Sequence, residues 1–192
     1  MERFFNKIIP ATVVLCSVLS VLSCSKTSLK SVWSTQEDKI DSFINSLPKE
    51  EDKEKPDALY VKDVIRNKGA NRVILQEGTG EGLEKGGRVT FYYAGYVFSG
   101  SLTASNMFAT NNAAQAEAAG WEVNDGDYSA KTVTLDSKSG LVEGLAKGLE
   151  GVRKGEICYI IFSGEYGFGK KPFGVIPGNS ALGYQIWVED VF

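Results

Sequence analysis

The residues of this chain that could do chemistry are apolar and aromatic. The sequence contains no histidine, which excludes Ser-His and Cys-His nucleophilic systems and the usual zinc sites. It contains 24 aspartates and glutamates, but none stands in an apolar run that would raise its pKa toward neutrality. A functional site here therefore has to use an apolar pocket, aromatic walls and backbone N–H donors, and we expect neither a metal nor a cofactor.

Rotation about an Xaa-Pro peptide bond is a reaction that suits such a site. Amide resonance sets a barrier of about 18–20 kcal/mol and makes the planar ground state polar and well solvated. A pocket that excludes water, grips the proline ring and meets the twisted carbonyl with a backbone N–H lowers this barrier. The reaction needs no acid, base or metal.

The stretch 140–169 is the best candidate to build such a pocket. Four apolar residues recur at helical spacing and predict a short amphipathic helix: Leu141, Val142, Leu145 and Leu149. Arg153–Glu156 predicts a turn, and Ile157–Phe162 predicts a strand that is apolar on both faces. The loop Glu165–Gly169 places aromatic residues between glycines, which suits a flexible rim over an apolar cleft. The plainer alternative is a core helix and strand followed by an ordinary loop.

Strand patterns surround this stretch and indicate the fold class. Tyr60–Ile65 and Asn71–Gln76 form a hairpin candidate about the turn 67–70. Three further segments alternate as half-buried strands: Arg88–Val97, Lys131–Leu135 and Leu182–Val188. Residues 98–130 are a long insertion with a small capped helix at 113–119. Antiparallel strands with one helix before the penultimate strand predict an α+β half-barrel or a sheet wrapped on a helix.

The N-terminus predicts export and a lipid anchor. Arg3 and Lys7 precede an apolar run that ends at Leu22, the pattern of a signal peptide covering residues 1–23. Val21-Leu22-Ser23-Cys24 resembles a bacterial lipobox, so we expect Cys24 to be lipidated and the protein to face the periplasm or cell exterior; a plain secretory signal is the alternative. Cys158 would then be the one remaining cysteine, which rules out an intramolecular disulfide. The net charge of −3 offers no basic field for nucleic acid.

Residues 24–33 read as a polar tether, and residues 34–56 as a helix followed by a charged linker. Ser34 and Glu37 have capping-box spacing. An apolar stripe follows before Pro48: Ile40, Phe43, Ile44 and Leu47. We expect this helix either to pack on the main domain, residues 57–192, or to pair with a second copy in a homodimer.

Four segments in the main domain resemble, in order, those of the FKBP-type (macrolide-binding) peptidyl-prolyl isomerases. They are Val89–Gly95, Leu141–Leu145 with Gly148, Glu165–Gly169 and Val175–Pro177, and the resemblance runs from about residue 71 to residue 192. It implies an antiparallel five- to six-stranded half-barrel wrapped round one short helix. It also implies isomerase activity on proline-containing polypeptide clients, with a pocket between that helix and the concave sheet.

Carried over by position, the resemblance assigns the site residues. Tyr93, Val142 and Phe168 take the catalytic places, with the Val142 N–H donating to the substrate carbonyl. The substrate-binding places fall on Phe108, Leu141, Leu145, Ile176 and Tyr184. The family's usual acidic residue is Ala109 here, its tyrosine is Phe168, and its aromatic near Lys131 has no counterpart unless Trp121 or Tyr128 supplies one. A chaperone or interaction module with weak activity is therefore the alternative function, and a purely structural domain a third.

Overall fold

The computed structural model describes residues 11–49, 59–123 and 126–192, with side chains of the first helix described from residue 28 onward. The helices are α1 (Ala11–Ser46), α2 (Ala113–Ala118) and α3 (Glu143–Leu149), with single 3₁₀ turns η2 (Ala104–Asn106) and η3 (Gly164–Tyr166). The strands are β1 (Asp63–Asn67), β2 (Ala70–Gln76), β3 (Arg88–Val97), β4 (Met107–Thr110), β5 (Lys131–Thr134), β6 (Ile157–Phe162) and β7 (Leu182–Val191).

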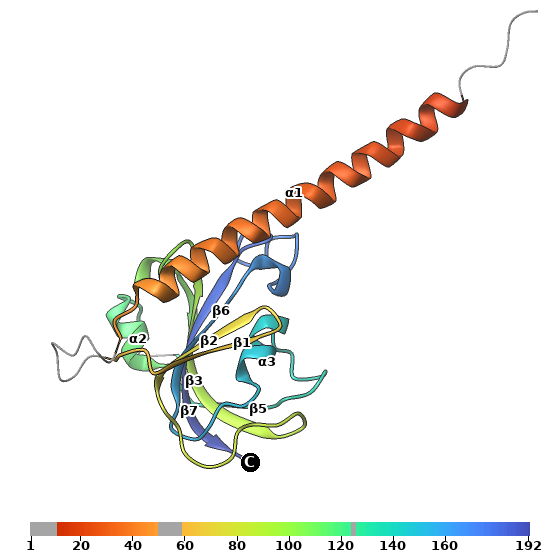
Figure 1. The fold of residues 1–192 in the computed structure, drawn as a ribbon. Helices are drawn as coiled ribbons and strands as arrows, with labels where there is room; N and C mark the ends of the chain where they lie inside the picture. Colours follow the sequence, from red (N-terminus) through yellow and green to blue (C-terminus); the bar gives the residue numbers. More distant parts are fainter. Residues whose placement is uncertain (1–10, 50–58, 124–125) are drawn as a thin grey trace, which may run out of the picture.

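The described strands form one antiparallel sheet in the order β1-β2-β6-β7-β3-β4, with β5 also paired to β3 (Figure 1). The predicted α+β class and sheet wrapped on a helix are confirmed, and the sheet has seven strands where five or six were expected. The first hairpin closes on Lys68 and Gly69, both at positive φ (49° and 93°), as a tight hairpin turn requires. The extra strand is β4, which lies inside the long insertion and pairs with the second half of β3.

The concave face of the sheet wraps around α3. Leu145 and Leu149 of this helix pack into one buried cluster with Phe91 of β3. The two helix glycines allow the close approach, because a Cβ on Gly144 would overlap the Phe162 ring. A Cβ on Gly148 would overlap the Ile160 side chain in the same way. The short helix is therefore held by packing, as its weak helix formers predict.

The outer face of the sheet is covered by α1, which explains why β6 is apolar on both faces. Ile40 and Ile44 are buried against Ile161 of β6, and Phe43 sits edge-on to Phe98 with ring centroids 5.5 Å apart. Figure 1 shows α1 and α3 on different sides of the sheet. The predicted apolar stripe 40–47 is confirmed, and it packs on the domain.

The expected start of this helix at Ser34 is wrong. The helix continues through Ser34 and through the segment 24–33, which we expected to be a polar tether. Thr35 is an interior helical residue whose hydroxyl donates to the carbonyl of Ser31 (3.0 Å). The uninterrupted run of non-proline residues from 11 to 46 gives the helix no reason to begin at a new cap.

Several N-terminal predictions fall on residues that the structure does not describe. Residues 1–10, the Cys24 side chain and most of the charged linker, residues 50–58, lie outside the described part. Among the helices that are described, none is both long enough and apolar enough to span a membrane.

The insertion forms ordered structure at the edge of the sheet. The side chain of Asn112 caps α2 by accepting from the Gln115 N–H, and Gly120 follows the helix at positive φ (75°). The predicted capped helix is thus confirmed. Because β4 pairs with β3, the insertion extends the wall of the half-barrel beside α3.

Candidate functional site

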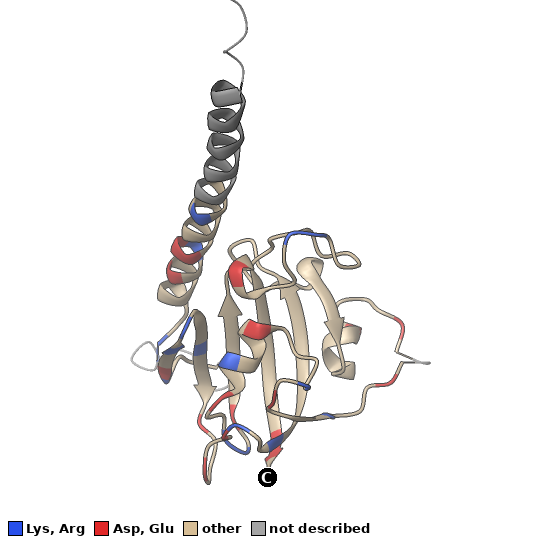
Figure 2. Ribbon diagram, turned by 90° about the vertical axis from the view of Figure 1, so that its right-hand side faces the viewer, with Lys and Arg blue, Asp and Glu red and all other residues tan. Residues whose placement is uncertain are grey.

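A cavity of about 290 Å³ opens between α3 and the concave sheet. Its walls are mainly aromatic and aliphatic: Phe91, Tyr93, Phe108, Ala109, Lys131, Gly140, Leu141, Val142, Leu145, Phe168, Phe173 and Tyr184. Figure 2 looks onto α3 and shows charged residues mostly on loops and at strand ends, with few on the strands behind the helix. Seven of the eight residues proposed for the site from the sequence line this one cavity.

Tyr184 of β7 is the centre of the aromatic wall. Phe108 of β4 meets it edge-on at 5.8 Å and 89°, and Phe162 stacks on it at 6.0 Å and 17°. Gly95 makes room for this arrangement, because a Cβ there would lie 2.8 Å from the Phe108 ring and 2.9 Å from the Tyr184 ring. Burial raises the pKa of Tyr184, and to a smaller extent so does nearby Tyr93, so its hydroxyl stays neutral in the physiological range.

Val142 lines the cavity at the start of α3. It is the N-cap residue in an extended conformation (φ −63°, ψ 143°), and its carbonyl accepts from the Ala146 N–H at 3.0 Å. Its own N–H has no hydrogen-bond partner among the described residues, as is usual at the first turn of a helix. The cavity wall therefore carries a backbone donor without an internal partner.

A buried arginine holds the other end of α3. The Arg72 guanidinium donates to the carbonyls of Glu150 (2.8 Å) and Gly148 (3.3 Å), which the helix end leaves without partners. Glu156 lies 3.5 Å from the Arg72 Nε and also accepts from the Arg153 N–H (3.2 Å). Burial raises the pKa of Glu156 despite the opposing attraction of Arg72. The expectation that no carboxylate has a raised pKa is therefore wrong for this residue, which is buried immediately before β6. This network fixes the position of the helix that lines the pocket.

Asn111 positions Tyr93 and was not identified from the sequence. On the edge of β3 that faces away from β7, the pairing with β5 ends at Phe91 and the pairing with β4 begins at Ala94. The β3 backbone between them therefore lacks a strand partner on that edge. The Asn111 side chain fills this gap. It accepts from the Tyr93 N–H (2.6 Å) and donates to the Phe91 carbonyl (3.3 Å) and the Ser129 carbonyl (2.9 Å). In the sequence, Asn111 stands next to the helix-capping Asn112, so the pair indicated only the start of a helix. The contacts of Asn111 with residues far along the chain were therefore not predicted.

The loop between β6 and β7 forms the mouth of the cavity. Phe168 and Phe173 stack at 4.6 Å and 11°, and both line the cavity while remaining partly exposed. Ile176, expected in the pocket, is only 3% exposed and packs in the core beneath the loop. Phe173 occupies the mouth in addition to the residues expected there.

Gln36 of α1 ties the two ends of this loop together. Its side-chain NH₂ donates to the Asn179 carbonyl (2.8 Å), and its side-chain oxygen accepts from the Gly164 N–H (2.8 Å). Gly164 follows β6 and Asn179 precedes β7, and a Cβ on Gly164 would overlap the Asn179 carbonyl. A helix on the outer face of the sheet thus braces the loop at the mouth of the inner cavity.

The departures from the family pattern are visible in the cavity. Lys131 lines it at the place where an aromatic residue was missing, and Ala109 lines it where an acidic residue is usual. Trp121 and Tyr128 do not line the cavity; Trp121 is 38% exposed, and the Tyr128 hydroxyl donates to the Glu122 carbonyl. Within the described residues, no cluster of three metal-ligating side chains occurs.

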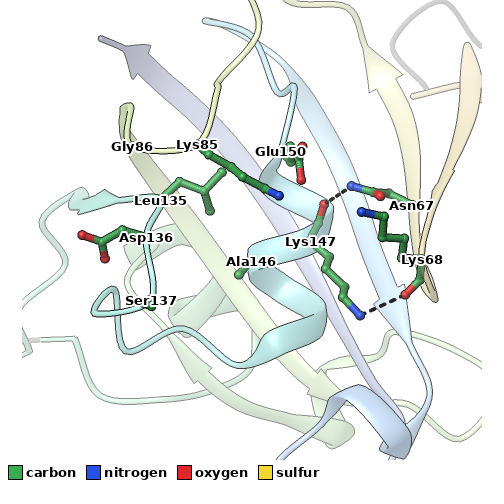
Figure 3. A pocket seen from close by; sticks show the side chains of 10 residues that line it. All are labelled: Asn67, Lys68, Lys85, Gly86, Leu135, Asp136, Ser137, Ala146, Lys147 and Glu150. Atoms are coloured by element: carbon green, nitrogen blue, oxygen red, sulfur yellow. Dashed lines mark hydrogen bonds between the residues drawn. The ribbon is translucent and has the colours of Figure 1, made fainter.

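A second cavity, of about 430 Å³, lies on the other flank of α3, between the β1–β2 turn and the end of β5 (Figure 3). It is larger, and most of its lining residues are charged or polar, among them Lys68, Lys85 and Asp136, although these residues turn mostly apolar atoms toward it. Lys147 in its wall is already engaged, with its ammonium 2.8 Å from Glu143 and 3.1 Å from the Lys68 carbonyl. The smaller cavity is the better candidate, because it has aromatic walls and includes Val142, whose N–H is unpaired.

Comparisons with known proteins agree with this geometry. The model of the family "FKBP-type peptidyl-prolyl cis-trans isomerase" matches residues 80–189. FK506-binding protein 1 of Gibberella zeae is 25% identical over 124 residues, which cover 64% of this chain and 98% of the relative.

Two solved structures resemble the fold. The wheat FKBP73 structure, with three FKBP domains, has a TM-score of 0.52 at 20% identity, covering 69% of this chain and 50% of that one. FkpA from Escherichia coli has a TM-score of 0.51 at 19% identity, covering 94% of this chain and 70% of that one. This chain thus spans half the length of the wheat protein.

Proposed function

The chain belongs to the FKBP-type peptidyl-prolyl cis-trans isomerase family, and we propose that it catalyses rotation about Xaa-Pro bonds of exported polypeptides. The observation that carries the proposal is the cavity beside α3, which has aromatic walls and includes Val142, whose backbone N–H has no partner among the described residues. Such a site favours the twisted, less polar amide over the planar, solvated one. The function needs no ionisable catalytic group, which fits a cavity whose tyrosines stay neutral.

Each wall of the cavity has a part in the proposed reaction. The proline ring enters between Tyr93, Phe108 and Tyr184, with Leu145 beneath it. Displacing water from this space removes the solvation that stabilises the planar amide. The Val142 N–H then donates to the carbonyl as the amide twists, an interaction that is worth most in the transition state.

A second candidate function is a binding module of the same fold. Phe168 lacks the hydroxyl that would bond a ligand, and Ala109 lacks a carboxylate. Phe173, 61% exposed, adds apolar surface at the cavity mouth. These features favour a protein that binds an apolar client segment over one that catalyses rotation about its Xaa-Pro bond.

Proton NMR exchange spectroscopy on short Xaa-Pro peptides separates the two functions without a coupled protease. The isomerase proposal predicts accelerated cis–trans exchange on adding the purified full chain. The double variant Ala109→Asp with Phe168→Tyr changes little if the site is competent, and raises the rate strongly if it is degenerate. Peptide binding without any exchange, in a folded protein, would refute the isomerase and leave the binding module.

We also propose that Cys24 carries the lipid anchor and that the protein works at the bacterial envelope. The support is the lipobox-like segment 21–24 behind a basic and apolar N-terminus. Several acyl chains on one residue give stable anchoring, at about 0.8 kcal/mol for each buried CH₂. Mass spectrometry of the expressed chain tests this: acylation at Cys24 that disappears in Cys24→Ser supports it, and an unmodified Cys24 contradicts it.

A further inference from the structure

We propose that lysine side chains at the cavity, chiefly that of Lys131, make the pocket select particular Xaa-Pro bonds. The selected bonds have an aspartate or glutamate within about two residues of the proline. The inference rests on the proposed function, because it names the substrates of that same cavity. In the described part of the chain, Lys131 is the one charged residue among those that line the cavity. It comes from β5, opposite Phe91 of β3, at the edge of the aromatic wall.

The Lys131 ammonium has no carboxylate partner among the residues that the structure describes. None of the ion pairs between described residues includes it, and no carboxylate lines the cavity. Glu143, on the first turn of α3, is already paired with Lys147 at 2.8 Å. A lysine beside an apolar cavity, with no internal counter-charge, attracts an anionic group on whatever enters.

Two more lysines lie beside the same mouth. Lys170 and Lys171 are exposed in the short loop that joins Phe168 to Phe173, and both of these phenylalanines line the cavity. The chain as a whole carries a net charge of −3. Lys131 and these two lysines outnumber the one acidic residue of the same loop, Glu165, which favours an acidic client segment over a basic one.

The reach of Lys131 sets the position of the acidic residue. An extended client advances about 3.3–3.6 Å per residue, and a lysine side chain reaches roughly 6 Å, or roughly two residues. With the proline ring in the cavity, the ammonium is therefore within reach of a side chain one or two positions away. An exposed ion pair of this kind contributes about 0.2–1 kcal/mol, which predicts a preference of up to about fivefold.

The test uses three peptides that are identical except for glutamate, glutamine or lysine two residues from the same Ala-Pro unit, with a second set on the other side of the proline. For each, kcat/KM comes from NMR exchange and Kd from chemical-shift titration, with the purified full chain. We expect glutamate to be favoured over glutamine by about twofold to fivefold in at least one set, and lysine to be the poorest. Raising the salt concentration to 1 M should reduce these ratios.

Variants assign the preference to the lysine. Lys131→Gln should remove most of it, Lys131→Glu should reverse it, and the control Lys138→Gln, an exposed lysine on the loop after β5, should leave it unchanged. Equal Kd values for the three wild-type peptides, or a preference that is undiminished in Lys131→Gln, would overturn the proposal. Absence of exchange with every peptide would refute the proposed isomerase instead, while the Kd ratios would still decide the charge preference.

Discussion

Replacing Gln36 by leucine should loosen the mouth of the cavity, although neither hydrogen-bond partner of the Gln36 side chain lines the cavity. The variant removes two hydrogen bonds of 2.8 Å, from the Gly164 N–H and to the Asn179 carbonyl. Each contributes about 0.5–1.5 kcal/mol net, so the loss is about 1–3 kcal/mol. Because Gly164 is buried, its N–H stays without a partner and the cost falls toward the upper end. Leucine and glutamine have similar helix propensities, so α1 itself is unaffected.

Two readouts separate a positioning role from a general loss of stability. Urea unfolding should show the loss of about 1–3 kcal/mol, and native-state hydrogen exchange should show faster exchange of the loop 163–181. The kcat/KM for Xaa-Pro peptides should fall mainly through a higher KM, because the Phe168–Phe173 wall becomes less ordered. Gln36→Glu should be at least as harmful, since a carboxylate faces the Asn179 carbonyl with no proton to donate.

The matched control is Ser42→Ala, because the Ser42 hydroxyl bonds only within α1, to the Asp38 carbonyl. It should leave the loop exchange and KM unchanged. Gln36 does not position the loop if Gln36→Leu lowers stability while hydrogen exchange in the loop and KM stay at wild-type values. The same conclusion holds if the variant changes none of the three quantities.

Three further predictions follow from the packing and charges around the site. Gly95→Ala should lower kcat/KM at least as clearly as it lowers the thermal midpoint, because its methyl displaces the Phe108 and Tyr184 rings; near-normal turnover would contradict this. Asn111→Ala should destabilise the fold by about 2–4 kcal/mol in urea unfolding, since the Tyr93 N–H and Phe91 carbonyl lose their partner, and a loss below about 1 kcal/mol would count against its bridging role. The raised pKa of Glu156 means that the folded state holds the carboxyl proton more tightly than the unfolded state does. The contribution of Glu156 to the free energy of unfolding therefore falls as pH rises through that pKa. Glu156→Gln should remove this dependence of the free energy of unfolding on pH, and an unchanged dependence would show that Glu156 is not its source.

The elements around α3 could be predicted from the sequence, because the spacing of residues close together in the chain determines them. The helix stripe at 141–149 and the doubly apolar β6 follow from residue spacing alone. The second apolar face of β6 is covered by α1, a contact that the sequence did not assign to this strand.

The contacts that the sequence left unpredicted join residues far apart in the chain. Gln36 and Gly164 are 128 residues apart, and nothing near Gln36 marks it as a partner of the loop. Ser34 and Glu37 have the spacing of a capping box, but Ser34 lies in the interior of α1, where no helix begins. β4 was missed because four residues inside an insertion carry too little pattern to identify a strand.

The central claim is that the free N–H of Val142 donates to the substrate carbonyl during rotation. Replacing Val142 by proline tests this claim most directly. The Val142 φ of −63° already matches proline, so Val142→Pro removes the donor with little change to the backbone. Val142→Ala is the control, because it trims the side chain and keeps the N–H. NMR exchange on an Xaa-Pro peptide should show kcat/KM lowered about tenfold in Val142→Pro, the equivalent of one hydrogen bond of about 1.4 kcal/mol. Val142→Ala should retain most of the activity. Equal rates in the two variants, with both proteins folded, would contradict the account.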